Sequence, residues 1–127
     1  MSDKSQTPLL LLDNGSMMSV VNQGEFKSTN LSFEEAKSIL DMYGEEHVLK
    51  CFSDNRIESI IFDYLDISRR NYTYKRIRNM RPDQDAIVFK LYTTPSETQP
   101  ILITPEGVEA KKVENVYIYC QFLSRIK

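Results

Sequence analysis

The stretch AIVFKLY at residues 86–92 is almost continuously apolar and follows the turn residues Pro82 and Asp83. Such a run is typical of a strand buried on both faces near the centre of a sheet. The run LLLL at residues 9–12 has the same character, and the turn residues at 13–15 close it. We therefore place both stretches in one sheet.

Two amphipathic patterns predict helices that pack on this sheet. The first begins at a capping box formed by Ser32 and Glu35, and it ends at Gly44. The second begins after Asp54, a good N-cap, and repeats apolar residues at helical spacing. Its opposite side carries charged residues, Glu58 among them, and we expect that side to lie on the surface.

Shorter segments complete the prediction of secondary structure. We expect strands at 25–29, 72–78, 101–103 and 116–123, a short helix at 105–111, and either a strand or a helical turn at 17–21. Strands and helices mix without strict alternation, which indicates one domain of the α/β (α+β) kind. We predict a single mixed sheet of about five strands flanked by helices over residues 9–127, after a disordered tail at residues 1–8.

Basic residues gather in one part of a mildly acidic chain. The 127 residues include 16 Lys and Arg against 18 Asp and Glu, giving a net charge of −2. Six of those basic residues lie in RRNYTYKRIRNMR at 69–81, which has no acidic residue. Such a strip favours a phosphate-bearing ligand over long nucleic acid, and Tyr72 or Tyr74 could stack on a base. The other interpretation is a solvated face whose arginines pair with carboxylates elsewhere.

Composition also excludes several classes of site. Cys51 and Cys120 sit in apolar patterns without ligand spacing, so we expect buried, reduced thiols. His47 is the one histidine and CxxC is absent, so we expect neither a metal nor another cofactor. No apolar run is long enough to span a bilayer, and we expect a cytoplasmic protein with no membrane partner.

Two polar segments lie where predicted elements meet. The segment at 13–16 follows the first strand, where it can offer donors to a ligand or simply form an Asx turn. The segment at 53–56 opens the second helix, whose N-terminus attracts anions unless Asp54 occupies the same donors as a cap. Glu97 is the carboxylate of a polar loop, and His47 follows two glutamates in a surface-like context. Spacing alone supports an anion-binding domain.

Several segments, taken in order, resemble a family of small α/β proteins from archaeal viruses and bacterial mobile elements, whose viral members are anti-CRISPR ring nucleases. The matching pieces are LLLLDNGSM, QGEFKSTNLSFEEAKSIL, FDYLDI, KRI, DAIVFKL, ITPEGVEA and a closing strand that ends in FLSRI. They cover most of the chain from Leu9 onward. The resemblance implies a homodimer that binds cyclic tetra-adenylate, the messenger of type III CRISPR immunity, in a pocket across the dimer interface. Family members cleave this ring without a metal and so silence the effectors it activates.

The candidate ligand-binding residues lie in three segments, and they are Asn14, Gly15, Ser16, Asn55, Arg56, Lys75 and Arg76. The resemblance carries over Asn14, Ser16, Lys75 and Arg76, whereas Arg56 replaces a small residue of the family and would add a new cation at the mouth of the pocket. Glu97 matches a loop glutamate of the family. However, Asp54 stands where the family's catalytic histidine falls, and Thr94 stands at the loop arginine. A general acid or base and a phosphate-stabilising cation are both replaced, although cleavage would use each of them.

The resemblance and its departures together lead to one expectation and two alternatives. We expect a counter-defence protein that binds and sequesters a cyclic nucleotide in the host cytoplasm, with cleavage weak or missing. The first alternative is an active, metal-independent ring nuclease that uses His47, Asp54 or Glu97. The second is a viral regulator that binds nucleic acid or protein, although the overall acidity argues against long nucleic acid as a partner.

Overall fold

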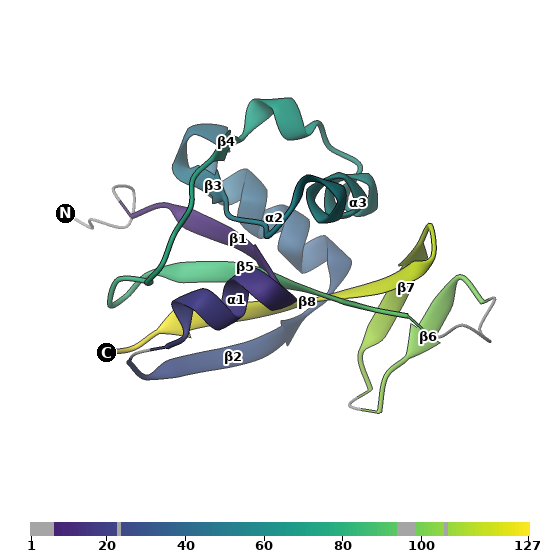
Figure 1. Ribbon diagram of the computed structural model, residues 1–127. Helices are drawn as coiled ribbons and strands as arrows, with labels where there is room; N and C mark the ends of the chain where they lie inside the picture. Colours follow the sequence, from purple (N-terminus) through teal and green to yellow (C-terminus); the bar gives the residue numbers. More distant parts are fainter. Residues whose placement is uncertain (1–6, 23, 94–98, 106) are drawn as a thin grey trace.

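Four parallel strands form one half of a single mixed sheet (Figure 1). In order across the sheet they are β4 (Thr73–Tyr74), β3 (Val48–Lys50), β1 (Leu9–Asp13) and β5 (Asp85–Tyr92). β1 and β5 are the two apolar stretches of the sequence, and the buried residues Leu9–Leu12 confirm that β1 is covered on both faces. The computed structural model describes residues 7–22, 24–93, 99–105 and 107–127.

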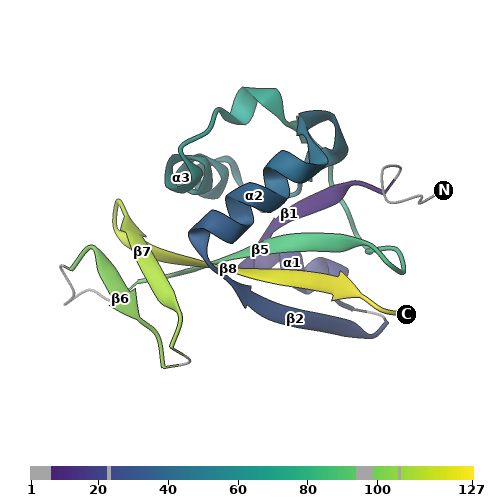
Figure 2. The same cartoon turned by 180° about the vertical axis from the view of Figure 1, so that it is seen from behind.

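The other half of the sheet is antiparallel and is organised by one long strand. β8 (Val116–Arg125) pairs with β5 along one edge, and its other edge carries β2 (Phe26–Leu31) and β7 (Glu109–Val113). β6 (Ile101–Ile103) pairs with β7 as a hairpin. This hairpin lies at one end of the sheet (Figures 1 and 2), where Lys111 of β7 lies over the ring of Phe33 at the start of α2 (Phe33–Tyr43).

Helices cover both faces of the sheet. α2 (Phe33–Tyr43) and α3 (Asn55–Leu65) lie on one face, and the short α1 (Asn14–Val20) lies on the other (Figures 1 and 2). Two 3-10 turns, Glu45–His47 and Arg69–Asn71, precede β3 and follow α3.

The period of a β-strand divides the apolar residues between two cores. Leu9 and Leu11 face α2 and α3, whereas Leu10 and Leu12 face α1. The larger core contains the aromatic residues of α3 and β5, and the smaller one includes Met80, which is fully buried. The sheet is therefore the shared wall of both cores.

Both predicted helix starts are confirmed. Ser32 and Glu35 form a capping box at α2, which ends at Gly44 with a positive φ of 80°. Asp54 caps α3, with Oδ1 accepting the backbone N–H of Ile57 at 2.8 Å. The segment at 17–21, which the sequence left open, belongs to a helix.

Three predictions about the sheet were wrong. Within the described residues it has eight strands instead of about five. The helix expected at 105–111 is a turn followed by β7, because Gly107 adopts φ 83° and reverses the chain from β6. The strand expected at 72–78 is limited to Thr73–Tyr74, beyond which the chain leaves the sheet. Most of the tail predicted at 1–8 lies outside the described residues.

Candidate functional site

The predicted ligand-binding segments meet at the carboxyl edge of the parallel strands. The segment at 14–16 follows β1, the segment at 53–56 follows β3, and Lys75 and Arg76 follow β4. Parallel neighbours end at the same edge, and open α/β sheets bind their ligands there. The topology therefore brings together residues that are up to about sixty positions apart in the chain.

Asp13 joins two of these segments. Its carboxylate is 1% exposed and accepts hydrogen bonds from both Ser16 and Ser53. One oxygen accepts the backbone N–H and the hydroxyl of Ser16 at 2.7 and 2.8 Å, and the other accepts the hydroxyl of Ser53 at 2.6 Å. Asp13 also caps α1. The carboxylate thus holds the loop before α3 against the end of β1 and fixes the edge on which the site is built.

A cavity of about 430 Å³ opens on the α1 side of this edge. Its lining combines small polar residues from the start of α1 with two arginines of the basic stretch. These residues are Gly15, Ser16, Ser19, Arg76 and Arg78. Arginine forms bidentate hydrogen bonds to phosphate, so the cavity is suited to an anionic ligand.

The chain around Ile77 explains how the two arginines reach this cavity. Ile77 packs against the smaller core, and its neighbours Arg76 and Arg78 remain exposed. The same segment is held at Met80, which is buried and whose carbonyl accepts a hydrogen bond from the Arg125 guanidinium. The basic stretch is therefore anchored by its apolar residues while its charges face outward.

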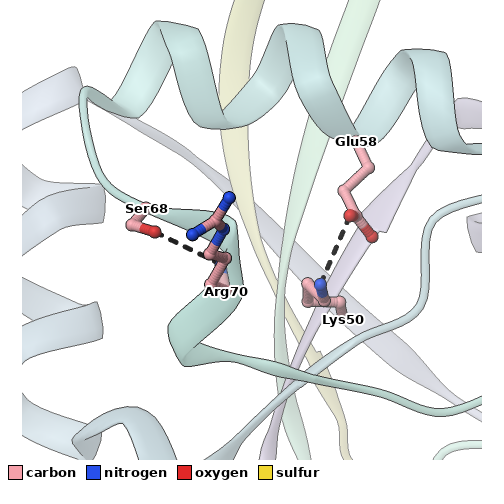
Figure 3. A network of polar contacts seen from close by, with 4 residues as sticks. All are labelled: Lys50, Glu58, Ser68 and Arg70. Atoms are coloured by element: carbon pink, nitrogen blue, oxygen red, sulfur yellow. Dashed lines mark hydrogen bonds and ion pairs between the residues drawn. The ribbon is translucent and has the colours of Figure 1, made fainter.

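A second cavity of about 550 Å³ opens at the same edge on the α3 side. Lys50 of β3 and Glu58 of α3 line it together with Asn55 and Tyr74. The Lys50 Nζ lies 3.3 Å from Glu58 Oε2, and Figure 3 shows the glutamate projecting from the helix toward the lysine. In the same view the backbone N–H of Arg70 donates to Ser68, beyond the end of α3.

Of the charged residues predicted on the solvated side of α3, Arg56, Asp63 and Asp66 are exposed, and the prediction was wrong for Glu58. Glu58 is 6% exposed and Lys50 is 8% exposed. Lys50 also lies 5.9 Å from the ring centroid of Phe62, which excludes water from one side of the ammonium group. Helical spacing alone could not reveal this pair, because its partner comes from a different element. The one feature of the sequence that pointed to a buried ion pair was Lys50, which ends the otherwise apolar strand β3.

Tyr74, rather than Tyr72, is placed to stack on a ligand. Tyr72 packs 5.5 Å from Phe62 between ring centroids, and burial raises its pKa. Tyr74 is 56% exposed, pairs in register with Lys50, and lines both cavities. An exposed aromatic ring at the junction of two polar cavities is a suitable platform for a base.

The other predicted ligand-binding residues have mixed positions. Asn55 lines the α3-side cavity, whereas Arg56 and Lys75 are exposed beside the site. The side-chain amide of Asn14 accepts the backbone N–H of Leu91 at 3.0 Å and donates to its carbonyl at 3.4 Å. Asn14 therefore ties α1 to β5, and any ligand contact from its side chain would compete with these bonds.

The two catalytic candidates that the structure describes, His47 and Asp54, are not brought together. His47 immediately precedes β3 and lines a mostly apolar cavity of about 520 Å³ with Tyr43 and Asp85, at the opposite edge of the parallel strands. Asp54 caps α3 at the carboxyl edge. Glu97, like Thr94, lies outside the described residues. The edge thus has the geometry of a binding site, and His47 and Asp54 cannot act as a pair.

Both cysteines are free and buried, as predicted. Burial raises the pKa of Cys51 to about 12 and that of Cys120 to about 12. Among the described residues, no group of three or more His, Cys, Asp or Glu side chains gathers to hold a metal ion. In the same part of the chain, no helix is long and apolar enough to cross a bilayer.

Comparison with known proteins adds no assignment to this site. No protein-family model matches the sequence. No curated protein matches it significantly either.

Proposed function

We propose that this chain is a ring-nuclease-like counter-defence protein of a virus or mobile element. It binds a cyclic nucleotide second messenger at a homodimer interface in the host cytoplasm. By sequestering the messenger it blocks antiviral signalling of the type III CRISPR kind or a related kind. The proposal begins from the order of segments shared with that family and is supported by the geometry of the carboxyl edge.

The observation that carries the proposal is the convergence of three separate segments around one cationic cavity. Ser16, Ser53 and Arg76 come from after β1, after β3 and after β4, yet they line the same space. Their groups match what a cyclic nucleotide offers, since guanidinium groups bind phosphate and Tyr74 can stack on a base. A ring of several nucleotides has internal rotational symmetry, and two copies of the edge related by a two-fold axis would suit it.

Sequestration fits the described residues better than cleavage. Cleavage of a phosphodiester uses a general acid or base within reach of the reacting atoms. Asp54 accepts a backbone hydrogen bond as the cap of α3, and Asp13 accepts hydrogen bonds from two serines. These carboxylates hold the edge together, and His47 lies at the other edge. A protein that binds without turnover needs no more than a rigid, complementary pocket.

A panel of cyclic oligonucleotides and cyclic ADP-ribose isomers tests the proposal. The protein is incubated with each compound, washed, and denatured by heat, and the released ligand is identified by mass spectrometry. Intact ligand at a stoichiometry of one ring per two chains supports sequestration by a dimer. Linear product supports a nuclease instead. Absence of binding to every compound, with the chain monomeric in solution, removes both.

The second alternative, a regulator that binds nucleic acid or protein, makes a different prediction. Phosphate-backbone binding to long DNA or RNA weakens steeply with added salt. Binding to a long duplex or single strand with a large salt slope, in the absence of binding to small cyclic ligands, would favour that alternative.

A further inference from the structure

Among the described strands, β2, β4 and β6 each have one edge without a neighbouring strand. β4 is followed directly by Lys75 and Arg76, and β2 carries Lys27 among exposed polar residues. Charged residues on or beside an edge strand discourage pairing with another chain. β6, the outer strand of the hairpin in Figure 1, has no charged residue and exposes two large apolar side chains. Its edge is therefore the least protected of the three.

The exposed side chains of β6 belong to Ile101 and Ile103, which are 48% and 64% exposed. They are two residues apart and point to one face of the sheet, where Ile101 lines a cavity together with Phe33 of α2. Apolar residues exposed singly need no explanation, but two on one face of an open edge form a surface that another strand can cover. Covering them removes apolar area from water and so stabilises the contact.

The backbone groups of the same two residues point away from the hairpin. The carbonyl of Pro100 accepts a hydrogen bond from β7, and the N–H of Thr104 donates one to the chain opposite it, both at 2.8 Å. Hydrogen-bonded pairs alternate along an antiparallel ladder, so Leu102 also bonds to β7. The N–H and C=O groups of Ile101 and Ile103 therefore lie on the outer edge, where an added strand can pair with them.

We infer that β6 pairs antiparallel with β6 of a second copy of this chain, with Leu102 on the two-fold axis. In this register Ile101 of each copy lies opposite Ile103 of the other, and their outward N–H and C=O groups bond to each other. Within the hairpin, Lys111 lies beside Ile101 and Glu109 beside Ile103. Each row of side chains across the contact therefore begins with a lysine of one copy and ends with a glutamate of the other. The edge is thus complementary to itself in shape and charge, as an isologous contact requires.

This contact is separate from the dimer of the proposed function and goes beyond it. The cationic cavity lies at the ends of β1, β3 and β4, whereas β6 is the last strand of the opposite half of the sheet. Pairing through β6 joins two of the proposed dimers into a tetramer. Each β6 strand has 3 residues, so the contact is small and should dissociate on dilution, unlike an obligate interface.

Sedimentation equilibrium of the full chain over a concentration series measures this association. Ile103→Lys places a charge in the apolar contact, so we expect association through β6 to weaken at least about tenfold and the average mass to fall toward half of the native value. The matched control is Ile126→Lys, because Ile126 is 50% exposed and lies beyond the end of β8. It should keep the native association, and both variants should keep the native melting temperature. A folded Ile103→Lys variant with the native mass at every concentration overturns the inference.

Two cysteine variants test the register. On the two-fold axis the two copies of residue 102 form a non-hydrogen-bonded pair with Cα atoms about 4.5 Å apart, which a disulfide can bridge. Leu102→Cys should therefore form a covalent dimer with glutathione disulfide as oxidant, visible on a non-reducing gel. The two copies of residue 101 lie farther apart than the roughly 7 Å that a disulfide tolerates, so Ile101→Cys should not cross-link. Failure of Leu102→Cys to cross-link, or equal cross-linking by both variants, overturns the inference.

The failure of this inference can be distinguished from the failure of the proposed function. If Ile103→Lys lowers the mass but no cyclic nucleotide binds, the proposed function is wrong and pairing through β6 stands. If one ring is recovered per two chains and Ile103→Lys leaves the mass unchanged, pairing through β6 is wrong and the proposed function stands.

Discussion

Replacing Asp13 by alanine should destabilise the protein far more than a typical surface mutation. Asp13 is buried and accepts hydrogen bonds from Ser16 and from Ser53. Loss of a helix cap costs about 1 kcal/mol. Leaving the part-buried donors of Ser53 without their acceptor adds about 1–3 kcal/mol. The sum, about 2–4 kcal/mol, is a large fraction of the roughly 5–15 kcal/mol that stabilises a domain.

Urea denaturation followed by circular dichroism measures this change, because the chain has no tryptophan for fluorescence. For 127 residues, the expected loss corresponds to a fall of roughly 6–20 °C in melting temperature. Asp63→Ala is the control, since Asp63 is exposed on α3 and should change stability by less than about 0.5 kcal/mol. If Asp13→Ala costs less than about 1.5 kcal/mol, Asp13 does not hold the carboxyl edge together in the way described.

Three further predictions follow from buried groups and backbone geometry. Cys51 and Cys120 should react with iodoacetamide at pH 8 about a thousandfold more slowly than a free thiol. The reason is that burial raises each thiol pKa from 9.0 to about 12 and so lowers the fraction of reactive thiolate. Labelling within minutes would contradict this prediction. Gly24→Ala should destabilise the protein more than Gly107→Ala. Both glycines have a positive φ, but only a Cβ at residue 24 would clash with a backbone carbonyl, that of Lys127. Equal unfolding free energies of the two variants would refute this clash. Burial and the neighbouring carboxylate of Asp85 raise the pKa of the Tyr43 hydroxyl to about 12, so the protonated hydroxyl stabilises the fold below pH 10 and this stability is lost as the pH rises toward 12. Tyr43→Phe should reduce this alkaline loss of unfolding free energy in urea titrations. An unchanged loss would show that Tyr43 is not its source.

Local signals predicted the central strands and the helix starts. Successive side chains of a strand point to opposite faces of the sheet, so a strand of four leucines must be covered on both faces to bury them all. Leu9–Leu12 are all buried. The capping box at Ser32 and the cap at Asp54 depend on contacts within three residues, so they are visible in the sequence. For the same reason the carboxyl-edge position of the segment at 14–16 could be predicted once β1 was placed.

Signals that depend on distant partners could not be read in advance. The burial of Glu58 requires Lys50 from another element, and neither residue indicates the other by spacing. The segment at 105–111 begins with a proline, which favours a helix start, yet the pairing of β6 with β7 determines its conformation. β2 has exposed polar residues along most of its length, and its pairing with β8 is what makes it a strand.

The most direct test of the central claim is the effect of the two cavity arginines on ligand binding. Isothermal titration of the tightest-binding cyclic nucleotide into the native chain and into Arg76→Ala/Arg78→Ala compares their dissociation constants at one salt concentration. We expect binding of one ring per two chains and at least a tenfold loss in the variant, because guanidinium–phosphate contacts are charge-assisted. Undiminished affinity in a folded variant would contradict a phosphate site at the carboxyl edge.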